Sequence, residues 1–191
     1  MSSLQQQQRR RPWSKRPASD LVYFVYFGSH IVFTLVMDAP TLLAASGMVP
    51  SALLAPVREY VKLTSDPLMG AALVGAAEAT WFRAFLACEL GLQLPVFFVA
   101  ARRLYHDTVD DRTKSLLAMY GAHVATAMVP ILATIVTSRA IPSTTKRLVL
   151  IGAYLPYFAL PAHMAWRYAL KSALFGGVPS TSAIKDPRQI E

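Results

Sequence analysis

Two polar side chains interrupt one of the most apolar stretches of the chain. In FLACELGLQLP, residues 85–95, Glu89 and Gln93 are four positions apart, so they share one face if the stretch is helical. If the stretch crosses a membrane, burying the carboxyl group costs at least about 2.5–3.5 kcal/mol, so that group must be paired, hydrated or protonated. Two interpretations remain open: a hydrogen bond between helices, worth about 0.6 kcal/mol, or a binding site.

Three further apolar stretches carry polar side chains at helical spacing. They are His30, Thr34 and Asp38 in or just after residues 21–37, His123 and Thr126 in residues 115–138, and Tyr154 and Tyr157 in residues 148–166. Each His or Tyr taken alone is ordinary for a packed helix, and Asp38 taken alone is an acid at the membrane boundary that faces water. Because all four stretches contribute such groups, the pattern predicts a common polar centre that binds a ligand.

Prolines fall inside or near the ends of the same stretches, at Pro95, Pro130, Pro156 and Pro161. A proline in a span frees a backbone carbonyl and bends the helix. Several bent helices around a polar centre would enclose a cavity, so we expect a pocket within the membrane.

The composition indicates a membrane protein. Of the 191 residues, 54% are hydrophobic and 16% are charged, against about 25% charged residues in soluble domains, and the mean hydropathy is +0.37. Residues 21–37, 81–101, 115–138 and 148–166 approach or exceed the length of about 20 residues that crosses a bilayer. The predicted fold is therefore all-α, a polytopic membrane four-helix bundle with proline-kinked helices.

The sequence also argues against a disulfide framework, a zinc site and a nucleic-acid interface. The single cysteine, Cys88, cannot form an intramolecular disulfide, and no Cys/His spacing suggests zinc, so we predict no metal and no cofactor. The net charge of +8 comes from basic residues that flank apolar stretches, which favours a membrane over nucleic acid as the partner. Residues 1–19 are rich in Arg and precede the apolar run 21–37, as the basic region of a signal peptide would. We do not interpret them as a signal peptide, because His30 interrupts the run and VMDAP, residues 36–40, lacks a cleavage pattern.

The basic residues also predict the orientation and the domain limits. With four spans, both termini share a side with the connection around residues 102–114, and that side holds most of the Lys and Arg residues, which predicts cytosolic termini. Residues 1–19 are predicted to be a disordered basic tail, residues 20–175 the four-span domain, and residues 176–191 a flexible tail. Between the first two spans, VPSALLAPVREYVKL predicts a short amphipathic helix at the interface or across the end of the bundle.

Five sequence blocks follow one another in an order and spacing that resemble a known family. They are YFGSHIVFTLVMDAP, DPLM, WFRAFLACELGLQLPVFF, MYGAHVATAMVPILATI and RLVLIGAYLPYFALP, and they cover most of residues 23–161. They resemble the sigma-2 receptor/transmembrane protein 97 family of the EXPERA superfamily, which also contains the emopamil-binding sterol isomerase. The resemblance implies an EXPERA-like domain, a multi-pass protein of the endoplasmic-reticulum membrane, homodimer formation, and an occluded pocket that opens sideways to lipid and binds sterols or cationic amphiphiles.

The resemblance also assigns site residues by motif. Asp38 becomes the acid that binds an amine, His30 a pocket histidine, and Asp66 of DPLM a companion acid. The other expected ligand-binding residues are Glu89, Gln93, Tyr60, Tyr154 and Tyr157. If Asp38 and Asp66 lie within about 4–6 Å of each other, they should share a proton. The chain departs from the family pattern at Ala127 and Met128, where Thr and Leu are expected, which affects the shape of the pocket.

We favour a protein that binds sterols or other lipids, takes part in sterol and lipid homeostasis, and is not an enzyme. The first alternative is a sterol Δ8-Δ7 isomerase, which would use Glu89 with His123 or His30 to add one proton to an alkene and remove another. The lack of an acid within residues 115–138 weakens the analogy to the isomerase branch. The second alternative is a proteostasis factor of the endoplasmic reticulum for mistargeted mitochondrial precursors, which fungal-looking relatives suggest and no residue supports.

Overall fold

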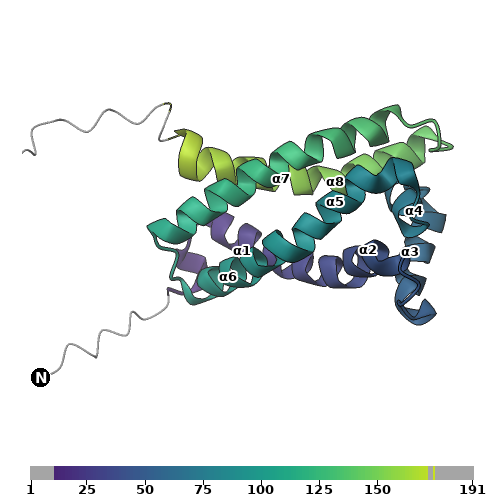
Figure 1. Ribbon diagram of the computed structural model, residues 1–191. Coiled ribbons are helices and arrows are strands. Elements are labelled where there is room, and N and C mark those ends of the chain that lie inside the picture. The colour runs from purple at the N-terminus through teal and green to yellow at the C-terminus, as the bar shows by residue number, and fades with distance from the viewer. Residues whose placement is uncertain (1–10, 172–173, 175–191) are drawn as a thin grey trace, which may run out of the picture.

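Four long apolar helices form the body of the protein (Figure 1). The computed structural model describes residues 11–171 and 174, and every regular element in that part is helical. The helices long and apolar enough to cross a membrane are Ala18–Ala44, Ala77–His106, Asp111–Thr137 and Thr144–Leu170. At 1.5 Å per residue the shortest of them, with 27 residues, extends about 40 Å, more than the hydrocarbon thickness of about 30 Å. The predicted all-α membrane fold is confirmed.

Three of these spans contain a wider, π-helical turn. The first consists of α1 (Ala18–Phe33), the π turn η2 (Thr34–Asp38) and α2 (Ala39–Ala44), and the second of η3 (Ala77–Ala79), α5 (Thr80–Cys88), the π turn η4 (Glu89–Gln93) and α6 (Leu94–His106). The third span is the single α-helix α7 (Asp111–Thr137). The fourth span is α8 (Thr144–Ala165) followed by the π turn η5 (Trp166–Leu170). The first span therefore continues past residue 37, where the apolar run had placed its end.

The bundle is built from two closely packed helix pairs. Helices α7 and α8 form the most extensive contact and α1 and α6 the next, and both pairs run along the length of the molecule (Figure 1). A glycine permits the close approach of α7 and α8, because a Cβ atom at Gly121 would lie 2.4 Å from the carbonyl oxygen of Pro161 and 2.8 Å from the nitrogen of Ala165. Aromatic rings of Phe27, Phe97 and Tyr120 join the two pairs in the core.

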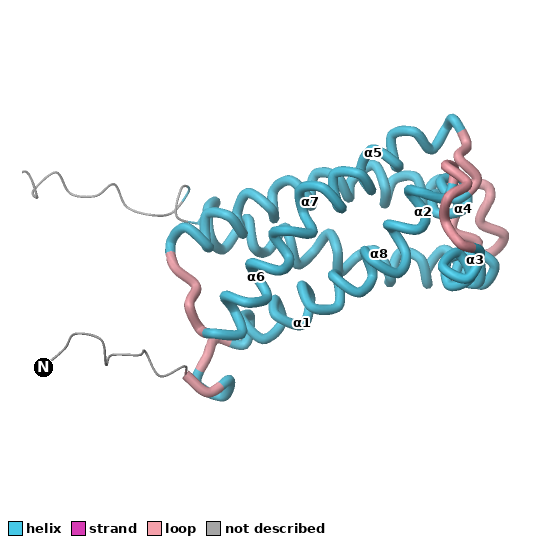
Figure 2. Tube along the Cα trace, turned by 60° about the horizontal axis from the view of Figure 1, so that its bottom comes forward, coloured by secondary structure: helices cyan, strands magenta, loops and turns pink. Residues whose placement is uncertain are grey.

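Two short helices lie at one end of the bundle, between the first and second spans (Figure 2). They are α3 (Ser51–Thr64), which contains Pro56, and α4 (Pro67–Leu73). Helix α3 buries Leu54 and Val57 and exposes its charged residues Arg58, Glu59 and Lys62, so it is amphipathic as its sequence predicts. It ends at Ser65, which adopts a left-handed conformation and leads directly into Asp66.

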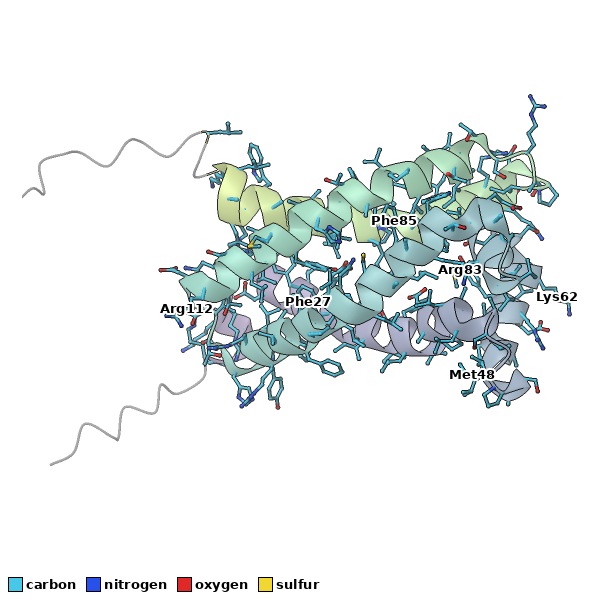
Figure 3. All side chains as sticks on the ribbon, in the orientation of Figure 1. Phe27, Met48, Lys62, Arg83, Phe85 and Arg112 are labelled. Atoms are coloured by element: carbon cyan, nitrogen blue, oxygen red, sulfur yellow. The ribbon has the colours of Figure 1, made fainter. Side chains whose placement is uncertain are left out.

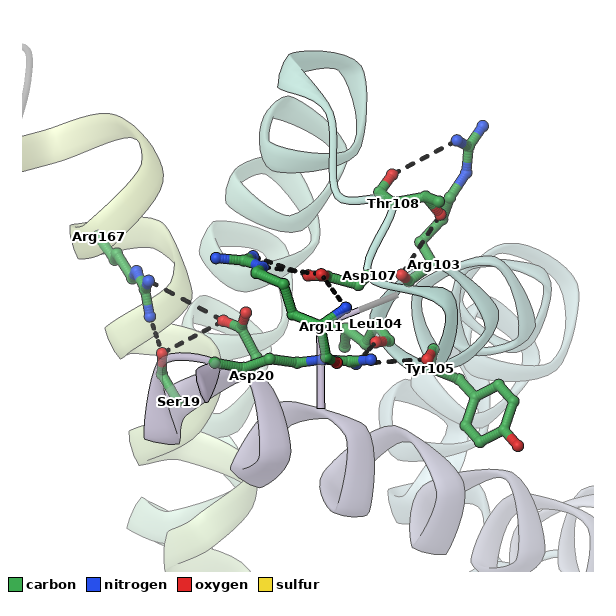
Figure 4. Close-up of polar contacts among 10 residues, drawn as sticks. Arg11, Ser19, Asp20, Arg103, Leu104, Tyr105, Asp107, Thr108 and Arg167 are labelled. Atoms are coloured by element: carbon green, nitrogen blue, oxygen red, sulfur yellow. Dashed lines mark hydrogen bonds and ion pairs between the residues drawn. The ribbon is translucent and has the colours of Figure 1, made fainter. Parts of the chain in front are cut away.

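The opposite end brings together the described ends of the chain and the connection between α6 and α7 (Figure 4). A 3-10 turn, η1 (Trp13–Lys15), precedes α1, and Arg16 is buried there with its guanidinium donating to the carbonyl oxygen of Leu104 at 2.7 Å. Arg11 forms an ion pair with Asp107, so residues 11–19 of the predicted basic tail pack on α6. Residues 1–10 and the predicted tail 176–191 lie outside the described residues.

Candidate functional site

Two π turns contribute the acidic residues of the candidate site. Each is followed by a proline at the second position of the next helix, Pro40 after η2 and Pro95 after η4. Because proline has no N–H to donate to the carbonyl four residues earlier, the regular helical ladder is interrupted and the chain forms one wider turn. The two π turns contact each other, which brings Asp38 at the end of one toward Glu89 at the start of the other.

A cavity of about 340 Å³ lies between the spans at this level. We call it the chamber. Seven of the eight predicted ligand-binding residues line it, all except Asp66, and the remaining wall is apolar, formed by side chains such as Phe33, Met37, Phe82, Phe85 and Ile131. Its size falls at the lower end of the range of small-molecule sites, about 300–1,000 Å³. The chamber is therefore mostly apolar, with its polar groups gathered in one part.

Glu89 is the centre of a buried polar cluster. Its Oε1 atom accepts a hydrogen bond of 2.5 Å from the Thr34 hydroxyl and lies 3.2 Å from Nε2 of His30. The carboxyl group of Asp38 also lines the chamber, on the π turn that contacts the turn carrying Glu89. Two acids brought together in an apolar space favour a shared proton, because two ionised carboxylates there would repel each other. We refer to His30, Asp38 and Glu89 as the chamber triad.

Aromatic rings fix the position of His30. Its ring stacks on Phe97 with centroids 4.4 Å apart and meets the edge or face of Tyr157 at 4.7 Å. Only 6% of the histidine surface is exposed, and its Nδ1 atom has no hydrogen-bond partner among the described residues. The ring can therefore act on Glu89 only through Nε2.

Asp66 lies behind the chamber wall rather than in it. As the N-cap of α4 it accepts hydrogen bonds from the backbone nitrogens of Leu68 (2.9 Å) and Met69 (3.1 Å), and its other oxygen accepts from the hydroxyls of Tyr60 (3.0 Å) and Tyr154 (2.6 Å). Burial, and then the neighbouring Asp66 carboxyl group, raise the pKa of Tyr60. The tyrosine hydroxyl therefore keeps its proton and remains a donor.

The carboxyl group that shares the chamber wall with Asp38 is that of Glu89, while Asp66 lies behind the wall, and the sharing of a proton between Asp38 and Asp66 stays a prediction. Asp66 is 99% buried, with four donors to its two oxygens. The N-cap geometry that DPL imposes explains this, because a carboxylate held by two backbone N–H groups is turned toward its own helix. Asp66 instead orients Tyr60 and Tyr154, whose rings face the chamber.

The third span contributes an apolar wall. His123 and Thr126, which the spacing had assigned to the polar centre, are exposed, and the Thr126 hydroxyl donates to the backbone oxygen of Ala122 in its own helix. The chamber is lined on this side by Val124, Ala127, Met128 and Ile131. Ala127 and Met128, where the family pattern has Thr and Leu, both line the chamber, so this departure lies in the chamber wall.

Two polar contacts near the chamber were not anticipated from the sequence. The hydroxyls of Tyr26 and Tyr120 are 2.7 Å apart in the core, and the Tyr23 hydroxyl lies 2.7 Å from Nδ1 of His163. The signal was present as tyrosines in the first and third apolar runs, but spacing within one helix does not reveal a partner in another. His163 is thus a structural residue.

A groove on the outside of the bundle adjoins the chamber. It is lined by residues of α1 such as Leu21, Val25 and Ser29 and by Pro156 and Leu160 of α8. Ala153 and Tyr157 line both the groove and the chamber, so the two spaces adjoin at these side chains of α8. The geometry as a whole provides an apolar space for a small molecule, with an acidic cluster inside it, next to a groove on the outside of the bundle.

Comparisons with known proteins agree with this architecture. Residues 52–168 match the EXPERA (EXPanded EBP superfamily) family. The chain is similar to the "Sigma intracellular receptor 2" of Xenopus tropicalis, with 34% identity over 148 residues that cover 73% of this chain and 81% of the relative. It is also similar to the human protein of the same name, with 32% identity, covering 72% of this chain and 79% of the relative. A third relative, the "Efficient mitochondria targeting-associated protein 19" of Schizosaccharomyces pombe, is 27% identical over 146 residues, 76% of this chain and 72% of the relative.

Proposed function

The chain belongs to the EXPERA superfamily and is related to the sigma intracellular receptor 2 proteins, and from this premise we propose that it binds sterols or cationic amphiphiles in the chamber. We place this activity in the membrane of the endoplasmic reticulum, with both termini in the cytosol and with a role in sterol and lipid homeostasis. Homodimer formation belongs to the same proposal and rests on the family resemblance.

The observation that carries the proposal is an apolar chamber with an acidic cluster in one part of its wall. A fused-ring or long-chain ligand would be held by Phe, Met and Ile side chains, with about 25 cal/mol for each Å² of apolar surface removed from water. An ammonium group would lie against Asp38, beside the aromatic rings of Tyr60, Tyr154 and Tyr157, which add cation–π attraction of about 0.5–2 kcal/mol. A sterol would direct its hydroxyl to the same carboxyl groups.

The groove between α1 and α8 supplies a route for such ligands. A lipid-soluble molecule that lies along the groove would reach the chamber by a rotation of the Tyr157 side chain, since Tyr157 and Ala153 line both spaces. No passage through water is then required, which suits ligands that are dissolved in the bilayer.

Photo-crosslinking with a sterol probe in microsomes tests the proposal. Ala127→Trp fills the chamber with an indole ring and should abolish crosslinking. Asp38→Ala combined with Glu89→Gln should reduce it strongly, because the hydroxyl loses its charged partners. His123→Gln on the exposed face of α7 is the matched control and should leave the signal unchanged. Full crosslinking in the Ala127→Trp variant, with the protein folded and inserted, would exclude the chamber as the site.

A second candidate function comes from the fission yeast relative, whose name refers to efficient mitochondria targeting. On that basis the chain would act in the handling of mitochondrial precursors at the endoplasmic reticulum. Quantitative proteomics after deletion tests this, with rescue by the wild type and by Ala127→Trp. Accumulation of mitochondrial precursors on microsomes that both versions correct would support a precursor-handling role that does not use the chamber.

The isomerase alternative depends on the His30–Glu89 pair. His123 is exposed on α7, which leaves His30, at 3.2 Å from Glu89, as the histidine available to move a proton. Incubation of the purified protein with a Δ8-sterol, followed by product analysis, decides between the two functions. We expect binding without conversion, and turnover that disappears in Glu89→Gln would establish the enzyme instead.

A further inference from the structure

The chamber contains acids and no strong base. Its three ionisable side chains that contact one another are His30, Asp38 and Glu89. Neither Lys nor Arg lines it, and in the described part of the chain the one ion-pair partner of Glu89 is His30, while Asp38 has none. Arg83 and the chamber residue Phe85 both belong to α5, but Arg83 does not line the chamber (Figure 3).

The other elements around the triad add no group that changes its charge on binding. Helices α3 and α8 contribute the hydroxyls of Tyr60, Tyr154 and Tyr157, which are neutral donors. Asp66 at the start of α4 accepts from two backbone nitrogens and from the hydroxyls of Tyr60 and Tyr154, and Lys146 of α8 donates to Ser65 at 2.9 Å. Gln93 of η4 is neutral, and α7 presents only apolar side chains to the chamber.

A net charge in this apolar space would be costly, because a buried ion that lacks a partner loses its hydration and changes its protonation state instead. The triad can be neutral in two ways. Either both carboxyl groups are protonated and His30 is neutral, or one carboxyl is ionised, the other is protonated and His30 carries the balancing charge. Both arrangements keep at least one proton on the Asp38–Glu89 pair, because two ionised carboxylates side by side in an apolar space repel each other.

A ligand cation adds one positive charge to a space that is neutral without it. Neutrality is restored when one proton leaves, from a carboxyl group in the first arrangement or from His30 in the second. From this charge inventory, and resting on the proposed function, we infer that a cationic amphiphile enters the chamber in exchange for one proton, whereas a neutral sterol enters without exchange. The chamber would then distinguish its two ligand classes by pH, with cations favoured as the surroundings become less acidic.

Isothermal titration calorimetry on the full chain in lipid nanodiscs tests the exchange directly. The probe is a single-chain quaternary ammonium amphiphile, which has no proton of its own to lose, measured at one pH in two buffers of different ionisation enthalpy. The expected difference in heat corresponds to about one proton released per ligand. The affinity for the amphiphile should rise by up to about tenfold for each unit of pH. A neutral sterol should give the same heat in both buffers.

A double variant tests whether the pH dependence comes from the triad or from other acids. Asp38→Asn with Glu89→Gln should bind the quaternary amphiphile more weakly and remove the pH dependence of its competition with a sterol probe. Asp111→Asn with Glu78→Gln, which alters two exposed acids, should keep both the affinity and the dependence on pH. If the first variant does not fold, the calorimetry on the wild type decides alone.

The outcomes are distinct for the two proposals. Binding of the quaternary amphiphile with no proton release and no dependence on pH would overturn the exchange and leave the binding function intact. Failure of both the amphiphile and the sterol to bind would overturn the proposed function, and the exchange with it.

Discussion

The two ends of the bundle treat their acidic residues in opposite ways. Near the described chain ends, each of three acids has an arginine. Asp107 pairs with Arg11 at 2.7 Å and Asp20 with Arg167 at 3.9 Å (Figure 4), and Asp110 pairs with Arg103 at 3.8 Å. In the chamber, Asp38 and Glu89 have each other, a histidine and a threonine, and no arginine or lysine.

The difference indicates what each group of acids is for. A carboxylate with an arginine at the surface is already neutralised, and such pairs add little to stability. A carboxyl group in an apolar space without a cation lowers stability, which supports the proposal that a ligand supplies the missing charge or hydrogen bond. Asp66 is intermediate, since it is buried but fully satisfied by donors.

The largest effect on stability is expected at Asp66. In Asp66→Ala, helix α4 loses its N-cap and the hydroxyls of Tyr60 and Tyr154 lose their acceptor, for a combined loss of about 3 kcal/mol. Thermal unfolding in detergent measures it, with Asp111→Ala at an exposed position as the control. An unfolding temperature equal to that of the control would mean that Asp66 belongs with the ligand-binding acids.

The second effect is on ligand selection rather than on stability. Asp38→Asn removes the charge next to a bound ammonium group and should weaken a cationic amphiphile by about 2 kcal/mol, or roughly 30-fold. A neutral sterol should change much less, because asparagine still offers a hydrogen bond. Competition binding against a sterol probe measures both, and an equal loss for the two ligands would contradict an ammonium site at Asp38.

A smaller loss of stability is expected at Thr34, the first residue of η2, whose hydroxyl donates to Glu89 of the triad. Thr34→Val keeps the shape of the buried side chain but removes the 2.5 Å hydrogen bond to Glu89, so the protein should lose about 1 kcal/mol of stability. Thr126→Val is the matched control, because that hydroxyl is exposed and bonds within its own helix. Unfolding in denaturant measures the free energy of unfolding of both variants. A lower value for Thr126→Val than for Thr34→Val would contradict a stabilising hydrogen bond from Thr34 to Glu89.

The smallest effect is expected at the arginine-paired end, and it depends on pH. The hydrogen bond from Arg11 holds the pKa of Asp107 at about 2, below its ordinary value of 3.8. A carboxyl group with a lowered pKa stabilises the folded state above its ordinary pKa, and that contribution disappears as the pH falls toward 2. The difference in unfolding temperature between the wild type and Arg11→Gln should therefore be small at pH 7 and shrink below pH 4. A difference that grows in acid would exclude this pairing as its source.

The spans could be predicted from the sequence, and their ends less well. Apolar length alone located all four, but each helix begins several residues before its apolar run, where capping residues start α7 and α8, and all except α7 end several residues after it. Asp110 accepts from the backbone nitrogen of Thr113, and Ser143 from that of Lys146. The first span passes beyond Asp38 because Pro40 is tolerated in the first turn of a helix.

The site could be predicted in its composition but not in its pairing. Helical spacing related His30 to Thr34 and Glu89 to Gln93 within single helices, and those faces do reach the chamber or its cluster. Spacing did not show that Glu89 would be the partner of Asp38, since that depends on how two helices cross. It also assigned the wrong face of α7, because a helix in lipid is apolar on both sides and periodicity does not reveal which side turns inward. Val124, next to His123, lines the chamber instead.

The π turns at Thr34–Asp38 and Glu89–Gln93 have a consequence for the history of the fold. Such a turn is equivalent to one residue inserted into a regular helix, and removing one residue would rotate everything on one side of it by about 100°. Deleting Leu35 would therefore rotate either His30 or Asp38 away from Glu89. Members of the superfamily that lack the extra residue should have lost the acid cluster too, so the length of this segment in an alignment is a marker of which relatives keep the chamber chemistry.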